Sequence, residues 1–138
     1  MRQRSAYAVT APGWAMLAGR ISYALGLHGP SIAFDTACSS ALSAHHAALS
    51  ALRNQDCTTA LVVGVNIMCN TEVSSALCVA GMLSHTGKSH TFDARADGYA
   101  RGEVCCSAAL RQSPGSWHVN AVCAAASVRQ DGKSASLT

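Results

Sequence analysis

The sequence predicts a layered α/β fold with a mostly buried sheet. Apolar periodicities alternate along the chain in the order helix, strand, helix, strand, helix, followed by two strands joined by a short reversal. The composition agrees, because the chain is rich in alanine and only 12% charged, which suits a tightly packed interior. Its 138 residues suffice for one domain with a core and are too few for two.

The first expected elements lie between residues 14 and 34. Large apolar residues recur at helical spacing over residues 14–23, and Gly26 is a plausible end for this helix. The pair Gly29-Pro30 interrupts the chain, and residues 32–34 form a short apolar run of the kind found in a buried strand. Residues 1–10 show no informative pattern.

The central part of the chain alternates between helix and strand. Residues 39–53 are the strongest predicted helix, with one stripe made by Leu42, His45, Leu49 and Leu52. Residues 59–65 are continuously apolar and β-branched, which indicates a strand covered on both faces. A weaker helix follows over residues 71–80, and residues 81–89 read as a loop.

The last elements are expected to form a hairpin. Residues 104–110 and 119–128 both favour strands, and residues 113–116 provide a short reversal between them. Ahead of this hairpin, Asp93 and Asp97 lack the glutamate that a calcium loop requires at its end. We therefore expect them to cap turns and to pair with Arg95 or Arg101.

Cys38 follows a strand and a turn and is expected at the first turn of the predicted 39–53 helix. Unpaired backbone N–H groups and the positive end of the helix dipole favour a thiolate at such a place. Strand-turn-helix elbows commonly carry a nucleophile. Free cysteines are also often small buried hydrophobes. The position alone leaves both interpretations open.

Several other site types are disfavoured by the sequence. The ten Lys and Arg residues are scattered, so no nucleic-acid stripe is predicted despite the net charge of +3. The seven cysteines never form Cys-x-x-Cys, so neither a zinc site nor a redox pair is indicated. No run is apolar enough to span a bilayer and no secretory leader pattern is present, so reduced thiols in the cytoplasm are expected.

Two histidines on the 39–53 helix are interpreted as structural residues. His45 lies seven residues past Cys38, which places it about 10 Å further along the helix axis. A nucleophile and its base need a separation of about 3 Å. His46 points in another direction again. We therefore expect neither histidine to act as the base for Cys38.

The motifs of this chain resemble those of β-ketoacyl synthases, in particular the ketosynthase domain of modular type I polyketide synthases. The resemblance covers nearly the whole chain from Ala18. It rests on motifs in the family's order and spacing: Ala18-Gly19-Arg20-Ile21-Ser22-Tyr23, Gly29-Pro30-Ser31, Asp35-Thr36-Ala37-Cys38-Ser39-Ser40, Leu61-Val62-Val63-Gly64-Val65-Asn66, Met82-Leu83-Ser84, Phe92-Asp93-Ala94, Ala96-Asp97-Gly98-Tyr99, Arg101-Gly102-Glu103 and Gln130-Asp131-Gly132.

The resemblance implies part of a thiolase-like αβαβα layered fold in a domain that forms homodimers. It implies that Cys38 accepts an acyl group from the phosphopantetheine thioester of an acyl carrier protein. A malonyl-type extender then loses CO₂, and its carbanion attacks the acyl-cysteine in a decarboxylative Claisen condensation. The backbone N–H of Cys38 would be one arm of the oxyanion hole. No metal and no directly bound cofactor is implied, and the resemblance assigns no substrate-binding residue here.

The same resemblance implies that residues 1–138 are a partial ketosynthase domain, truncated at both ends. The family's two catalytic histidines lie in His-Gly-Thr-Gly-Thr and Asn-Ile-Gly-His motifs, which this sequence does not contain. The chain by itself is therefore expected not to condense thioesters. It also departs from the family at Val104 and Cys106, where glycine is usual, and at His85, where proline is usual.

Two alternatives stay open at this point. One is a stand-alone fatty-acid 3-oxoacyl-[acyl-carrier-protein] synthase, which uses the same chemistry; the unbroken Asp35–Ser40 and Ala96–Glu103 motifs tilt the choice towards the polyketide type. The other is a non-catalytic structural or interaction role for this piece, which the missing histidine motifs favour.

Overall fold

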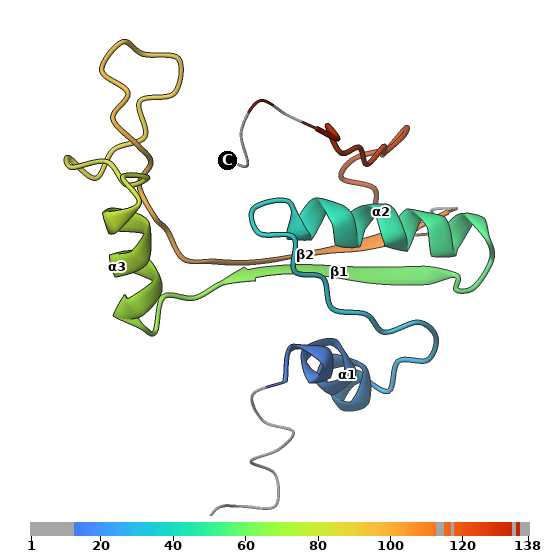
Figure 1. Cartoon of the computed structure of the whole chain (residues 1–138). Helices are drawn as coiled ribbons and strands as arrows, with labels where there is room; N and C mark the ends of the chain where they lie inside the picture. The colour runs from blue at the N-terminus through green and yellow to red at the C-terminus, as the bar shows by residue number, and fades with distance from the viewer. Residues whose placement is uncertain (1–12, 113–114, 117, 134, 136–138) are drawn as a thin grey trace, which may run out of the picture. The chain divides into compact units, whose positions relative to one another are not determined.

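A computed structural model describes residues 13–112, 115–116, 118–133 and 135 of the chain. Its elements follow the order α1 (Trp14–Leu25), α2 (Ser40–Arg53), β1 (Thr59–Asn66), α3 (Thr71–Val79) and β2 (Val104–Arg111) (Figure 1). The residues fall into two compact units: one up to residue 63 together with those from 107 on, and one over residues 64–106. No helix of the described part is both long enough and apolar enough to cross a membrane.

Helix α1 forms where the apolar spacing predicted it and continues for two further residues. Gly26 ends the helix in the left-handed conformation with φ of 63°, and Leu27 N–H donates to the Ser22 carbonyl at 2.8 Å. This is the ordinary glycine stop of a helix, since glycine adopts positive φ without a Cβ penalty. The large side chains of α1, such as Trp14 and Leu17, are exposed.

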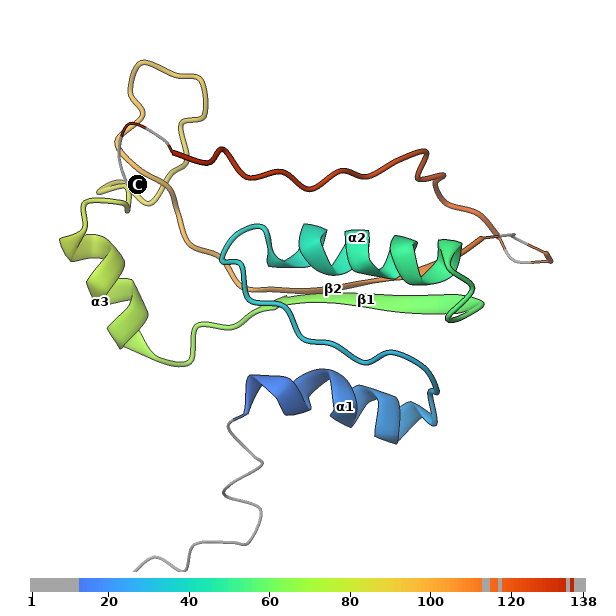
Figure 2. The same ribbon diagram turned by 45° about the vertical axis from the view of Figure 1, so that its right-hand side comes forward.

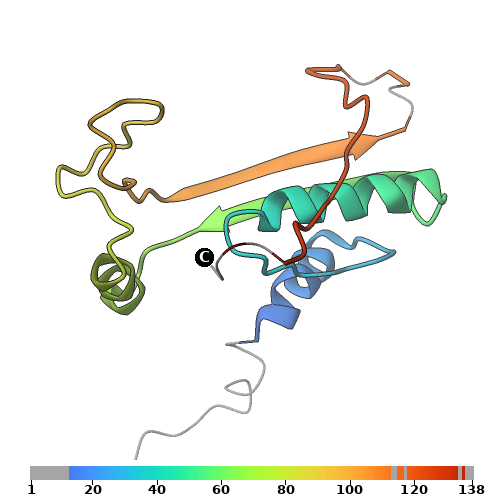
Figure 3. The ribbon, with the colours of Figure 1, turned by 45° about the horizontal axis from the view of Figure 1, so that its top comes forward.

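Helix α2 and the two-stranded sheet carry the small core of the described residues. Strands β1 and β2 pair with each other, and their arrows run in opposite directions (Figure 3). Helix α2 lies along this sheet in two views (Figures 1 and 2). Leu52 of α2 and Val62 of β1 are the only buried apolar side chains among the described residues, with exposed fractions of 4% and 9%.

The predicted strand β1 is confirmed, but its burial on both faces is not. Leu61 and Val65 are exposed, and only Val62 is buried. The reason is that one strand, β2, and one helix, α2, accompany β1 among the described residues. A continuously apolar strand can be packed on both faces, and here only some of the elements that would pack on it are present among the described residues.

The predicted strand at residues 32–34 is wrong. These residues form no ladder, and Ile32 is 60% exposed. The only pairing near them is an isolated bridge between Thr36 and Cys38 inside the turn. A strand exists only where a neighbouring backbone accepts its hydrogen bonds, and no described segment does so here.

The predicted hairpin is also wrong. β2 forms at Val104–Arg111 but pairs with β1, and residues 119–128 adopt no strand. Residues 113 and 114 of the predicted reversal lie outside the described residues. The hairpin was predicted because the two segments are close in sequence. In the structure, β2 pairs instead with the apolar strand β1, which lies beside α2 (Figure 2). Residues 119–128 keep their β-favouring composition with no strand beside them, and Val122 is 85% exposed.

Residues 64–106 are held together by a few specific contacts. Asn70 caps α3, because its side-chain oxygen accepts the Glu72 N–H at 2.7 Å. Glu103 Oε1 accepts the Met68 N–H at 2.6 Å. The 81–89 loop is fastened at Leu83, which forms a parallel bridge with Tyr99. These contacts place α3, the loop and residues 99–103 next to one another.

Candidate functional site: an exposed cysteine at a turn before α2

The turn before α2 is sharp because one residue takes a left-handed conformation. Ala37 has φ of 56°, an uncommon value for a residue with a side chain. The backbone N–H groups of Ser39 and Ser40 donate back to the carbonyls of Thr36 and Ala37 at 3.3 and 3.1 Å. The chain therefore reverses within a few residues before entering the helix.

Hydroxyl side chains fix this turn. Ser40 Oγ accepts the Thr36 N–H at 2.8 Å and donates to the Ala37 carbonyl at 2.7 Å. Ser39 Oγ donates to the Thr36 carbonyl at 2.8 Å, and the Thr36 hydroxyl also contacts Ser43 Oγ at 3.1 Å. The small polar residues on both sides of the cysteine thus bind the backbone, which offsets the cost of the left-handed Ala37.

Cys38 lies within this turn. Its side chain is exposed, so it is not the small buried hydrophobe that its residue type alone allows. Ser39 is the N-cap of α2, so Cys38 lies one residue before the cap and not in the first helical turn as expected. Its backbone N–H donates to no other described residue. An exposed thiol with a free amide beside it can attack a carbonyl and hydrogen-bond the oxygen that becomes charged.

His45 and His46 lie within α2 and are half-buried. Cys38 lies before the N-cap and outside α2, so the expected separation of about 10 Å along a common helix axis stays a prediction. The His46 carbonyl accepts the Ser50 hydroxyl at 3.0 Å, and the ring Nδ1 of His46 is buried with no partner among the described residues. That neither histidine acts as the base for Cys38 stays a prediction.

Asp93 and Arg95 form the ion pair that the sequence predicted, with Arg95 rather than Arg101 as the partner. Arg95 Nη2 lies 2.7 Å from Asp93 Oδ2, and Arg95 Nε and its backbone N–H both donate to Asp93 Oδ1. The side-chain contact with Arg95 lowers the pKa of Asp93 below its ordinary value and raises that of Arg95. The Ser84 hydroxyl, chiefly, lowers the pKa of Asp97.

No three His, Cys, Asp or Glu side chains of the described residues are arranged to hold a metal ion. Asp93 uses its carboxylate on Arg95, in agreement with the predicted ion pair.

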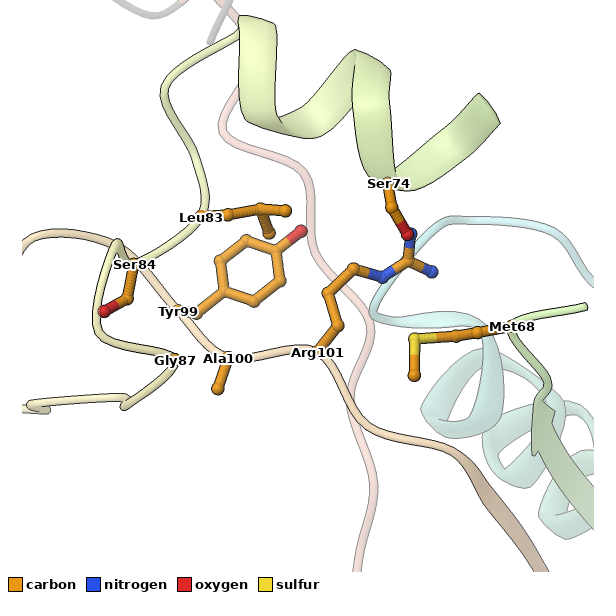
Figure 4. A pocket seen from close by; sticks show the side chains of 8 residues that line it. All are labelled: Met68, Ser74, Leu83, Ser84, Gly87, Tyr99, Ala100 and Arg101. Atoms are coloured by element: carbon orange, nitrogen blue, oxygen red, sulfur yellow. The ribbon is translucent and has the colours of Figure 1, made fainter. Parts of the chain in front are cut away.

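A cleft of about 360 Å³ lies within residues 64–106, and sequence reasoning did not anticipate it (Figure 4). The Arg101 guanidinium lies at one side, where Nη1 donates to Ser74 Oγ of α3 at 3.0 Å. Tyr99 and Leu83 lie next to it, with Met68 on the far side of the guanidinium (Figure 4). In the sequence, Tyr99 and Arg101 stand close together in one motif. That closeness does not show that α3 and the 81–89 loop approach these two residues.

Comparison with known proteins places these features in a family. Residues 1–113 match the family model described as Beta-ketoacyl synthase, N-terminal domain. The chain is 42% identical over 136 residues to the hybrid PKS-NRPS synthetase phm1 of a Pyrenochaetopsis species, covering 96% of this chain and 3% of that protein. It is 52% identical over 100 residues to the non-reducing polyketide synthase nvfA of Aspergillus novofumigatus, covering 71% of this chain and 4% of that protein.

Solved structures give the same result. The oxazolomycin ketosynthase domain OzmH KS7 of Streptomyces albus JA3453 matches with a TM-score of 0.72 and 37% identity, over 75% of this chain and 18% of that chain. The ketosynthase from module 6 of the bacillaene synthase of Bacillus subtilis 168 matches with a TM-score of 0.70 and 40% identity, over 79% and 20%. The predicted α/β fold of the thiolase-like class is confirmed, and the chain spans a small share of each of the four proteins named above.

Proposed function

We propose, from the premise that this chain belongs to the β-ketoacyl synthase family, that it is part of a polyketide ketosynthase in which Cys38 is the acyl-accepting nucleophile. The observation that carries the proposal is the exposed sulfur beside the left-handed Ala37 at the entrance to α2. The named relatives support the polyketide class over a stand-alone fatty-acid synthase, since both are polyketide synthases by description.

The first half-reaction is an exchange of thioesters. The Cys38 sulfur attacks the carbonyl carbon of an acyl group carried on the phosphopantetheine of an acyl carrier protein. The Cys38 backbone N–H donates to the oxygen that gains charge. The bond to the pantetheine sulfur then breaks, and the thiol proton of Cys38 passes to the departing pantetheine thiolate. The acyl group remains on Cys38 as a thioester.

The second half-reaction forms the new carbon–carbon bond. A malonyl-type extender on a carrier protein loses CO₂, and the resulting carbanion attacks the acyl carbon on Cys38. The Cys38 thiolate leaves as the β-ketoacyl product forms. This step needs histidines that stabilise the developing enolate, and the family's histidine motifs do not occur in this sequence. The chain alone is therefore proposed to accept acyl groups at most, without condensing them.

The active form is proposed to be a larger domain that acts as a homodimer with an acyl carrier protein as its partner. The small share of its relatives that this chain covers supports the proposal of a larger domain, because the chain matches only 18–20% of the two solved ketosynthase chains described above. The small core supports it as well, since two side chains alone are buried in the described residues. Residues 1–138 are accordingly proposed to be a partial ketosynthase domain.

The test is acyl loading in the full polypeptide that contains this chain. We expect Cys38→Ala to abolish the stable acyl adduct formed from an acyl-carrier protein, measured by mass spectrometry of the peptide that contains residue 38. Cys69→Ala is the matched control, because Cys69 is another exposed cysteine and lies outside the turn. Undiminished loading in Cys38→Ala, or loss of loading in Cys69→Ala, would assign the reaction to a different thiol.

A further inference from the structure

Arg101 is a half-buried cation without a carboxylate partner among the described residues. Among the described residues, its side chain makes one hydrogen bond, from Nη1 to Ser74 Oγ at 3.0 Å. Glu103, the carboxylate closest to it in sequence, is engaged elsewhere, because it accepts the Met68 N–H at 2.6 Å. A guanidinium carries five N–H donors, so most of the hydrogen-bonding capacity of Arg101 is unused.

The surroundings of Arg101 form a cleft with one polar side and one apolar side. The Ser74 hydroxyl meets the guanidinium, and the Tyr99 hydroxyl points towards the same part of the cleft (Figure 4). Leu83 lies beside the Tyr99 ring, and Met68 lies across from it. The cleft of about 360 Å³ therefore offers a cation and hydroxyls to one end of a ligand and apolar side chains to the rest.

The Ser74 contact also holds the guanidinium in place. Ser74 lies within α3, whose start is fixed by the Asn70 cap. Arg101 lies two residues after Tyr99, and Tyr99 is bridged to Leu83 of the 81–89 loop. The cation is thus held between a helix and a fastened loop, and a ligand does not have to order a free side chain on binding.

We propose that the Arg101 cleft binds the oxyanion of a pantetheine-type thioester, either the phosphate of the pantetheine arm or the carboxylate of a malonyl group. A planar guanidinium donates two parallel hydrogen bonds to such an anion, which Lys cannot do. The apolar side of the cleft would take the adjacent carbon chain. The choice of ligand rests on the proposed function, since carrier-bound thioesters are its substrates.

The test measures binding in the full polypeptide with Cys38→Ala as background, so that no acyl transfer takes place. Isothermal titration calorimetry compares 4′-phosphopantetheine with pantetheine, and malonyl-pantetheine with acetyl-pantetheine. We expect one of the two anionic probes to bind about tenfold more tightly than its neutral counterpart, the usual size for a charge-assisted hydrogen bond. The pair that shows this difference identifies the phosphate or the carboxylate as the ligand group.

Arg101→Gln is expected to remove this advantage and leave the affinity for the neutral probe unchanged. Arg95→Gln is the matched control, because Arg95 is an arginine near Arg101 in sequence that is paired with Asp93 and 74% exposed. Arg101→Lys keeps a positive charge without the planar fork and is expected to lose most of the advantage, which covers the case in which Arg101→Gln does not fold. The proposal is overturned when neither anionic probe binds better, or when Arg95→Gln reduces the advantage as much as Arg101→Gln.

Because Cys38 is absent from these measurements, their failure leaves the loading experiment unaffected. Acyl loading on Cys38 together with equal binding of all four probes would overturn the Arg101 site alone. Binding at Arg101 without acyl loading in the Cys38-containing protein would instead refute Cys38 as nucleophile.

Discussion

Gly98 is the position at which a single added methyl group should disturb the structure most. Its φ is 134°, a value that side chains rarely allow. A Cβ there would lie 2.5 Å from the Leu83 carbonyl carbon and 2.6 Å from the Ser84 nitrogen. Both contacts are with backbone, so no side-chain rotation can relieve them. Gly98→Ala is therefore expected to push the 81–89 loop away from Tyr99.

The size of the effect follows from what the methyl group disrupts. A strained backbone conformation costs on the order of 1–3 kcal/mol. Two hydrogen bonds fasten the loop, from Tyr99 N–H to the Met82 carbonyl and from Ser84 N–H to the Tyr99 carbonyl, both at 3.1 Å. Each such bond contributes about 1 kcal/mol net. The free energy of local opening should therefore fall by about 3–5 kcal/mol.

Hydrogen exchange of the Tyr99 and Ser84 amides measures this opening in the full polypeptide. A loss of about 3 kcal/mol corresponds to exchange faster by about 150-fold. Two control variants separate the causes. Gly102→Ala meets nothing within 4 Å and has no positive φ, so exchange should not change. Gly87→Ala has φ of 64° and open space, so it isolates the conformational cost.

The reasoning is refuted when Gly98→Ala exchanges no faster than Gly87→Ala. That result would mean that the backbone contacts at Leu83 and Ser84 relax freely and contribute nothing to the position of the loop. The same variant would report on the Arg101 cleft, since Tyr99 and Leu83 both line it.

Two further predictions concern α3 and the Asp93 loop. Asn70→Ala removes the cap oxygen that accepts the Glu72 N–H and should destabilise α3 by about 1 kcal/mol. The loss should appear as faster amide exchange in that helix. Asn70→Ser keeps an oxygen at the cap and should retain most of the protection from exchange. Because Arg95 lowers the pKa of Asp93 below its ordinary 3.8, the ion pair should stabilise the loop above that pH and lose its effect as the pH falls through the lowered value. The difference in unfolding free energy between wild type and Asp93→Asn should accordingly vanish in acid; a difference that persists there would assign the effect to packing.

The helices were predictable because their signals are local. The spacing of Trp14, Leu17 and Ile21 and the glycine at residue 26 specify α1 without any distant contact. The same holds for α2, although Leu42 in its predicted apolar stripe is exposed. Periodicity identifies the apolar face of a helix, and a neighbouring element must still cover that face.

The pairing of strands was not predictable in the same way. The β-favouring composition of residues 119–128 and of β2 suggested one hairpin, while β2 instead pairs with β1 across about forty intervening residues. Composition describes how well a residue fits a pleated surface and carries no information about which backbone will be its neighbour. The short apolar run at residues 32–34 failed for the same reason.

The sequence by itself determined the cysteine turn, since Thr36, Ser39 and Ser40 close it with hydrogen bonds over at most four residues, and such contacts depend on local order alone. The sequence pattern did not show that Ala37 takes the left-handed conformation, although the contacts that hold it are local, and only the structure shows that Cys38 is exposed one residue ahead of the α2 cap. The tertiary structure decided that Arg101 meets Ser74, twenty-seven residues earlier, in a shared cleft. A contact between distant residues depends on how α3 and the following loop fold back on the chain, and no short-range pattern encodes that path.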